Sequence, residues 1–505
     1  MRINSRDLVA SLLTSALIFA SPSIASADAY GDPLRINDSA PGNQVTNTAA
    51  VGANGDAAVV WSDGPATYVT RYDGAGRPLQ QRALSIPSGL TDMAVSGTGS
   101  FVTVRLVQNG AGSDIYATVY DRSGRVVAPE FMVNDSTGGQ RNHYGSMVAM
   151  NAAGQFAVVY QRWAPIGSGT MATDLFVKRY QANGAPITPT LYVRAAPSRI
   201  LADDIGIDDQ GNFVVIWNEV TVPTSANLYG WRFNASGGSS PYAFLIGTGE
   251  TQVPRLAMNG SGAFAVTTFG PASGNTWSAY AWRYNRDTSL MSGPLLVSTQ
   301  SGDPQCTDIG IASDGGFAVT WQQGTVQSPG PILLRTFDPR GTTNSGVMTA
   351  NAANGSAATY GCSKIGVAPS GDSWVAWTQR VSPTSPDGVD AFARRYMPPG
   401  VVVTPLADQQ TVTNLSGAAG SWSYYKVQVQ PGQTTLDVTM TGNAGDADLY
   451  VRLGALPTAN DWDGRPYIAG SNESVRMSSY PAGDWYIGIN GYTSYSAVSL
   501  QSHAY

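Results

Sequence analysis

Residues 151–160 read NAAGQFAVVY, and close variants of this segment recur along the chain. The clearest copies are ANGDAAVVW at 53–61, DDQGNFVVIW at 208–217 and SDGGFAVTW at 313–321. Each copy predicts a tight turn followed by a short strand, because Asn/Asp–Gly turns need a positive φ that glycine tolerates. Seven glycines mark the repeats: Gly55, Gly99, Gly154, Gly211, Gly262, Gly315 and Gly371. Their mean spacing of about 53 residues is close to the length of a β-propeller blade.

The pattern within each repeat predicts four antiparallel strands. In the third repeat an apolar run at 148–150 precedes the turn, the strand 156–160 follows it, and a further strand is expected at 175–180. The segment 130–134 is the expected fourth strand of the second repeat. Four-stranded units arranged radially leave only short edges exposed. The sequence therefore predicts an all-β protein with a seven-bladed β-propeller at residues 28–397.

The last repeat is incomplete. It ends at Pro398-Pro399-Gly400 after three expected strands, while PLRIND at 33–38 looks like EFMVND at 130–135. We therefore expect the N-terminal strand to complete the last blade and close the ring. An open solenoid is the alternative, although it would not need a split repeat.

The first 27 residues are predicted to be a signal peptide. Arg2 and Arg6 precede an apolar stretch at 8–20 that is too short to span a membrane, and Ala25-Ser26-Ala27 is a cleavage motif. An uncleaved helical anchor is the alternative. No later segment is long and apolar enough to span a membrane, so we expect a secreted or periplasmic mature chain. We also expect it to be a monomer.

The charge composition argues against a nucleic-acid partner. Only 13% of residues are charged, the net charge is −6, and no block of Lys or Arg occurs. Nucleic-acid binding usually needs a basic surface.

The charged residues nearest the expected channel form the candidate ligand site. Long loops between the second and third strands, such as 162–173 and 220–226, should share one face of the propeller, where binding usually occurs. The position seven residues before each motif glycine should surround the mouth of the channel. It holds Thr48, Asp92, Met147, Asp204, Arg255, Asp308 and Lys364. With the neighbouring Asp203, the six charged side chains are candidate ligand-binding residues. Two interpretations stay open: a site for a cation or polar ligand, or charges that compensate one another.

Cys306 and Cys362 each lie nine residues before a motif glycine, in adjacent repeats. A disulfide between them suits an exported protein. The alternative is that their strands are too far apart, because bonded cysteines need Cα atoms within about 7 Å.

Residues 398–505 carry a different set of motifs. They include GSWSYYKV at 420–427, PGQTTLDV at 431–438, GDADLYVR at 445–452 and PAGDWY at 481–486. In these motifs and their order the segment resembles the bacterial pre-peptidase C-terminal domain. The resemblance implies a jelly-roll-like β-sandwich, appended to secreted enzymes, that assists export or holds the protein on an insoluble polymer.

Some members of that family bind calcium, which makes calcium the candidate ion here, although no cofactor is required. Asp446 and Asp448 should lie on one strand face and offer oxygen ligands. Alternatively, they cap a turn.

No catalytic residue can be assigned. The chain has two histidines, of which His143 falls in an expected connection and His503 at the C-terminus. Recognisable hydrolase and metalloprotease motifs are absent from the sequence. We therefore expect a secreted non-catalytic binding protein whose partner is an extracellular polymer or a cell-surface protein or glycan. The alternative is an extracellular hydrolase, directed at glycans or peptides, that uses carboxylates at the channel mouth.

Overall fold

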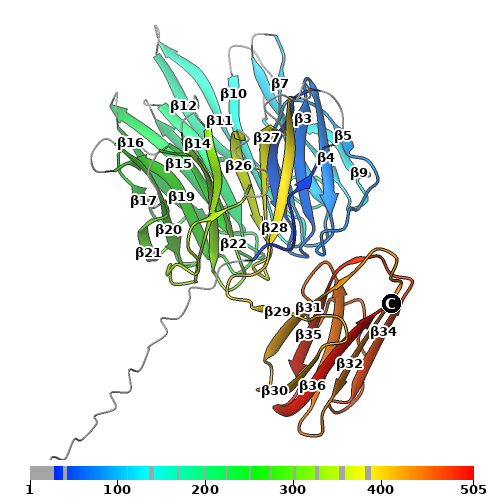
Figure 1. The fold of residues 1–505 in the computed structure, drawn as a ribbon. Coiled ribbons are helices and arrows are strands. Elements are labelled where there is room, and N and C mark those ends of the chain that lie inside the picture. Colours follow the sequence, from blue (N-terminus) through cyan, green and yellow to red (C-terminus); the bar gives the residue numbers. More distant parts are fainter. Residues whose placement is uncertain are drawn as a thin grey trace, which may run out of the picture.

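The structure is a computed structural model of an all-β protein (Figure 1). It describes residues 28–37, 42–110, 112–135, 142–167, 170–187, 189–196, 199–222, 225–249, 252–272, 276–298, 303–324, 329–351, 359–380 and 388–505. The predicted signal peptide, residues 1–27, lies outside the described residues. Strands and turns make up the described ranges, which confirms the predicted fold class. Within these ranges, no helix has the length and apolar character needed to cross a bilayer.

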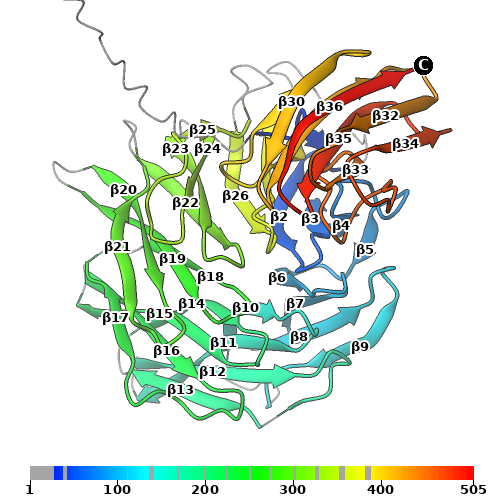
Figure 2. The same cartoon turned by 90° about the horizontal axis from the view of Figure 1, so that it is seen from below.

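The β-propeller consists, in the described residues, of seven four-stranded units. Figure 2 shows them arranged in a ring around a central opening. The innermost strands are β2 (Gln44–Val51), β6 (Leu90–Val95), β10 (Asn142–Met150), β14 (Arg199–Ile207), β18 (Gln252–Met258), β22 (Pro304–Ile311) and β26 (Thr359–Val367). The second strands are β3 (Ala57–Asp63), β7 (Phe101–Gln108), β11 (Phe156–Gly167), β15 (Phe213–Val222), β19 (Phe264–Pro271), β23 (Phe317–Gly324) and β27 (Ser373–Arg380).

The outer strands complete each unit. The third strands are β4 (Ala66–Tyr72), β8 (Ser113–Tyr120), β12 (Thr170–Tyr180), β16 (Ser225–Phe233), β20 (Trp277–Tyr284), β24 (Pro329–Phe337) and β28 (Val389–Tyr396). The fourth strands are β5 (Leu84–Ile86), β9 (Val126–Met132), β13 (Leu191–Ala196), β17 (Phe244–Gly247), β21 (Leu290–Leu296), β25 (Met348–Thr349) and, from the N-terminus, β1 (Leu34–Arg35). A parallel bridge between Ser113 and Asn142 also links the second and third units.

The motif glycines lie in the turns between the first and second strands. All seven have φ between 78° and 93°, a conformation that glycine adopts without steric cost. In the third unit the Gly154 N–H donates to the Asn151 carbonyl, and the Asn151 side chain accepts from the Gln155 N–H. In every unit the motif glycine donates in the same way to the carbonyl three positions earlier, and this residue is Asn or Asp in the third, fourth and fifth units.

Strand β1 pairs with β28, with Leu34 opposite Ala393 and Arg35 opposite Phe392. The N-terminal segment thus supplies the fourth strand of the last unit. Asn37 continues this contact, because its side-chain oxygen accepts from the Ala391 N–H at 2.8 Å.

Two segments expected to be loops are largely paired strand. Trp163 lies opposite Thr173 in β11 and β12, and Val220 lies opposite Ala226 in β15 and β16. The prediction of loops there is wrong, because the central hairpin of each of these units continues its backbone pairing beyond the neighbouring strands.

Stacked aromatic rings fill the propeller core. In five units the first residue of the second strand stacks on the last residue of the third strand, with ring centroids 4.7–4.9 Å apart. The pairs are Phe101–Tyr120, Phe156–Tyr180, Phe213–Phe233, Phe264–Tyr284 and Phe317–Phe337. These residues are 0–4% exposed, so each pair removes a large apolar area from water.

The C-terminal domain is a sandwich of two four-stranded sheets. One sheet contains, in spatial order, β29 (Val403–Pro405), β31 (Trp422–Val429), β35 (Gly483–Gly491) and β33 (Ala447–Leu453). The other contains β30 (Thr411–Gly417), β36 (Tyr495–Ala504), β32 (Thr435–Thr441) and β34 (Glu473–Ser478). Alternating apolar residues of both sheets, such as Val427, Ile487, Val438 and Leu500, form a shared core.

The sandwich lies against the propeller face that carries the glycine turns (Figure 1). Met397, Leu456 and Tyr486 form a small apolar cluster between the domains. Tyr30, two positions after the start of the described chain, contacts both domains. Its ring meets Tyr486 edge-on at 5.5 Å, its hydroxyl donates to Asp372 at 2.5 Å, and the Arg395 guanidinium lies 3.8 Å from its ring centre.

Candidate functional site

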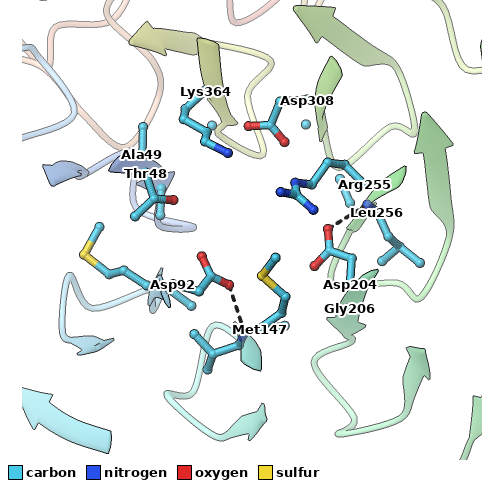
Figure 3. Close-up of a pocket in the computed structure, with 18 of the residues that line it drawn as sticks. Thr48, Ala49, Asp92, Met147, Asp204, Gly206, Arg255, Leu256, Asp308 and Lys364 are labelled. Atoms are coloured by element: carbon cyan, nitrogen blue, oxygen red, sulfur yellow. Dashed lines mark hydrogen bonds between the residues drawn. The ribbon is translucent and has the colours of Figure 1, made fainter. Parts of the chain in front are cut away.

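The innermost strands enclose a cavity of about 240 Å³ at the channel mouth (Figure 3). Each of the seven innermost strands contributes to its lining. At its rim the structure brings together all the residues predicted from the position before the motif glycines: Thr48, Asp92, Met147, Asp204, Arg255, Asp308 and Lys364. The five charged side chains are partly exposed, so solvent reaches them.

The three rim aspartates connect neighbouring units. Each carboxylate accepts a hydrogen bond from a backbone N–H of the next innermost strand. The pairs are Asp92 with Val148 at 2.9 Å, Asp204 with Leu256 at 2.8 Å and Asp308 with Ile365 at 3.0 Å. Asp204 and Asp308 also accept from the N–H of the residue that follows them. Their first role is therefore structural, since they satisfy backbone donors at the seams between units.

The two rim cations have no counter-ion contact. In the described part of the chain, neither Arg255 nor Lys364 forms an ion pair with a rim carboxylate. The Arg255 Nη1 group donates to the carbonyls of Asp203 and Pro254 at 3.3 and 3.2 Å, which orients the guanidinium. Figure 3 shows both cationic groups pointing into the open centre. Burial lowers the pKa of Arg255, but the charges of the rim acids, Asp204 first, raise it above its ordinary value, so the interpretation of charges that compensate one another stays open.

Burial changes the protonation of the rim. It raises the pKa of Asp204 to about 7, although Arg255 acts in the opposite direction. It also raises the pKa of Asp92, against the hydrogen bond from Val148. Burial first, and the charge of Arg255 second, lower the pKa of Lys364. The rim thus combines two carboxyl groups whose pKa values burial raises with two cations that form no ion pair within 4 Å in the described residues.

Asp203 does not line this cavity. Its carboxylate accepts from the Asn218 N–H at 2.7 Å within its own unit. The register of β14 and β15 shifts between Ala202 and Asp204, so Asp203 is the residue that has no opposite partner in this pair of strands. Burial raises the pKa of Asp203 well above its usual value.

Cys306 and Cys362 form a disulfide between β22 and β26, the innermost strands of adjacent units. Their Cα atoms are 5.1 Å apart, within the range that a disulfide needs. The bond therefore joins the same two units as the Asp308 carboxylate.

Asp446 and Asp448 have protein partners. Asp446 accepts from the Gly470 N–H at 3.0 Å, and Asp448 accepts from Arg465 at 2.7 Å. Among the described residues, no group of three or more His, Cys, Asp or Glu side chains could hold a metal ion. A calcium site at these positions stays a prediction.

His143 lies in strand β10, not in a connection, and is 2% exposed. Its Nδ1 is 3.0 Å from the Ser113 carbonyl oxygen and 3.5 Å from the Asp114 carboxylate. This histidine therefore belongs to the packing between the second and third units.

Sequence reasoning missed a second cavity, of about 640 Å³, between the domains. Arg395 and Asp372 of the propeller and Arg452 and Asp461 of the sandwich contribute to its walls. A repeat-by-repeat alignment could have signalled it, because Arg395 occupies a position that holds arginine in four other repeats.

The known proteins that resemble this chain match its C-terminal domain. Residues 423–491 match the family described as the bacterial pre-peptidase C-terminal domain, which confirms the resemblance seen in the sequence. Alkaline serine exoprotease A of Vibrio alginolyticus is 48% identical over 92 residues, which cover 18% of this chain and 17% of that protein. A zinc metalloprotease of Helicobacter pylori is 35% identical over 114 residues, covering 23% and 43%. An extracellular protease of Xanthomonas campestris pv. campestris is 32% identical over 97 residues, covering 19% and 17%.

This chain thus spans less than half the length of these relatives. Among solved structures, a C-terminal domain titled "Solution structure of vEP C-ter 100" is 40% identical, covers 19% of this chain and 96% of its own, and gives a TM-score of 0.18. A streptogramin B lyase is 12% identical, covers 72% and 97%, and gives a TM-score of 0.42.

Proposed function

We propose that this chain is a secreted binding protein that holds a ligand at the channel mouth of the propeller. The sandwich serves export or attachment to an extracellular polymer. The partner is such a polymer, or a protein or glycan of a cell surface. One observation carries the proposal: Arg255 and Lys364 face a solvent-reachable cavity without an ion-pair partner. Cations that solvent reaches and that form no ion pair can bind an anionic ligand group, and the open centre can admit one.

Two further observations support the extracellular setting. Residues 1–27 have the features of a signal peptide, and Cys306 and Cys362 form a disulfide, which persists in oxidising compartments. The relatives matched through the C-terminal domain include a protein named for its extracellular location.

The experiment uses the mature chain, residues 28–505, mixed with insoluble polymers such as cellulose, chitin, pectin and collagen and with whole bacterial envelopes. Retention on at least one material supports the proposal. An Arg255→Gln/Lys364→Gln variant separates the two domains' contributions, because it should weaken ligand binding by the propeller and leave attachment through the sandwich intact. Arg125→Gln is the control, since that side chain is 83% exposed and pairs only with Asp121 in its own turn. Failure of every material to retain the chain would overturn the proposal.

A hydrolase is the second candidate, and one observation favours it. The pKa of Asp204 is raised to about 7 by burial, the range in which a carboxyl group can act as a general acid near neutral pH. However, both oxygens of Asp204 accept backbone hydrogen bonds that position the rim. Degradation of a retained polymer, abolished in Asp204→Asn and unchanged in Arg125→Gln, would establish the hydrolase.

A further inference from the structure

We infer that the channel mouth takes the carboxylate of an acidic sugar, bound between Arg255 and Lys364. This inference rests on the proposed function and names the class of ligand. The two cations come from the fifth and seventh innermost strands, β18 and β26, and flank Asp308 of β22. They face the same open centre (Figure 3).

Asp308 does not neutralise these cations by direct contact. Its two oxygens accept from the Ile309 and Ile365 N–H groups at 3.1 and 3.0 Å. The guanidinium of Arg255 uses Nη1 on two carbonyls, while the rest of its donors have no protein partner in the described residues. The Lys364 ammonium likewise has none there. An anion with two oxygens can accept from both groups, and arginine is well suited to a planar carboxylate.

Repulsion between the two cations also favours a bound anion. The charge of Arg255 contributes to the lowered pKa of Lys364, after burial. A bound carboxylate would relieve this repulsion and raise the pKa of Lys364.

The other polar residues of the rim indicate what the rest of the ligand must be. Asp204 lies beside Arg255, Thr48 lies beside Lys364, and Asp92 lies across the opening from Asp308; their side chains offer acceptor oxygens to the same cavity. Sugar hydroxyls donate readily to carboxylates. A second carboxylate on the same sugar ring would be repelled, whereas a ring with one carboxylate and several hydroxyls matches both the cations and the acceptor oxygens. The cavity of about 240 Å³ suits one residue of a longer chain better than a whole ligand.

The test is calorimetric titration of the mature chain with trigalacturonate. Three matched probes are its methyl ester, a neutral trisaccharide, and acetyl-trialanine with a free carboxylate. We expect trigalacturonate to bind at least tenfold more tightly than each of the others. Arg255→Gln and Lys364→Gln should each weaken its binding at least tenfold, while Arg125→Gln should not.

The methyl ester keeps the test valid if a rim variant fails to fold, because it changes the ligand alone. Equal binding of ester and acid would overturn the inference. Preference for the peptide would overturn the sugar assignment in favour of a peptide carboxylate. If no probe binds but a polymer retains the chain, the inference fails and the proposed function stands. If no polymer retains the chain either, the proposed function fails as well.

Discussion

The Arg395 guanidinium donates a 2.8 Å hydrogen bond to the Gly454 carbonyl and so joins the last propeller unit to the sandwich. Arginine occupies the same repeat position in four other units, just before the last aromatic residue of the third strand. In those units it donates to a backbone carbonyl in a turn of the next unit. These arginines are Arg71, Arg179, Arg232 and Arg283. The sandwich therefore docks through a contact that the propeller uses between its own units.

Replacing Arg395 should loosen this docking. Arg395→Ala removes the bond to Gly454, the contact with the Tyr30 ring and a 3.6 Å ion pair with Asp372. We expect faster proteolysis of the connection at 397–402 and a larger radius of gyration in solution scattering. Arg283→Ala is the matched control, since it removes a bond within the propeller and should lower the melting temperature without affecting the connection. Equal proteolysis of Arg395→Ala and wild type would contradict the docking role.

The rim aspartates should contribute to stability whether or not a ligand is bound. Asp204→Ala leaves the Leu256 and Ile205 N–H groups without their acceptor. An unsatisfied buried donor costs about 1–3 kcal/mol, so we expect the free energy of unfolding to fall by about 2 kcal/mol. Asp204→Asn keeps one acceptor oxygen and should cost less. Urea denaturation of the three proteins measures this order, and identical midpoints would refute it.

The disulfide should stabilise the seam between the last two units. Its cysteines are 56 positions apart, and cross-linking a loop of that length lowers the entropy of the unfolded chain by an amount worth about 4 kcal/mol. A Cys306→Ser/Cys362→Ser variant should therefore unfold at a lower urea concentration. Reductant should shift the midpoint of the wild type toward that of the variant and leave the variant unchanged. A wild type that does not respond to complete reduction would show that the bond contributes little.

Glu473 should make the sandwich less stable as the pH rises. It is 3% exposed, and burial raises its pKa to about 7, although the Leu449 and Ile468 N–H groups favour the charged form. Asp448 raises this pKa further and Arg465 lowers it. The folded-state value lies above the unfolded one of about 4.3, so the folded state holds the proton more tightly.

The contribution of Glu473 to the free energy of unfolding is therefore complete below about pH 4 and is lost as the pH rises to about 7, by up to about 4 kcal/mol. Denaturation of wild type and Glu473→Gln at pH 4, 5.5 and 8 gives the difference between them. As the pH rises, the wild type should lose stability relative to Glu473→Gln, because glutamine does not titrate. Parallel profiles would exclude this carboxyl as the source.

The repeat was sufficient to predict the features that depend on local spacing. A glycine seven positions after Asp92, Asp204 or Asp308 sets the turn, and the turn sets which strand positions reach the channel. Cys306 and Cys362 likewise share one repeat position, nine residues before their motif glycines. By contrast, the spacing does not predict the surroundings of Asp203, which has no opposite partner at the register shift between Ala202 and Asp204 and accepts from the Asn218 N–H.

The domain docking could not be predicted in this way. Tyr30, Arg395 and Tyr486 come from distant segments, and their contacts depend on the orientation of two separately folded domains. No periodic pattern encodes that orientation. The hydrogen bonds that the rim carboxylates accept from the next innermost strand were also missed, because charge alone predicted pairing with the cations.

The rim aspartates lie in the second, fourth and sixth units and accept hydrogen bonds from the third, fifth and seventh. An alternation of this kind cannot close around an odd number of units, and the first unit, with Thr48 at this position, is the one left over. It is also the unit that continues directly from β1, which belongs to the seventh. The first and seventh units are therefore joined by the continuous chain and not by a rim carboxylate. Thr46 adds hydrogen bonds to Thr378 and to the Trp377 carbonyl at this boundary. At the level of the rim, carboxylates thus bridge three pairs of units, and the first unit is joined to the seventh by the continuous chain and to the second through Arg71.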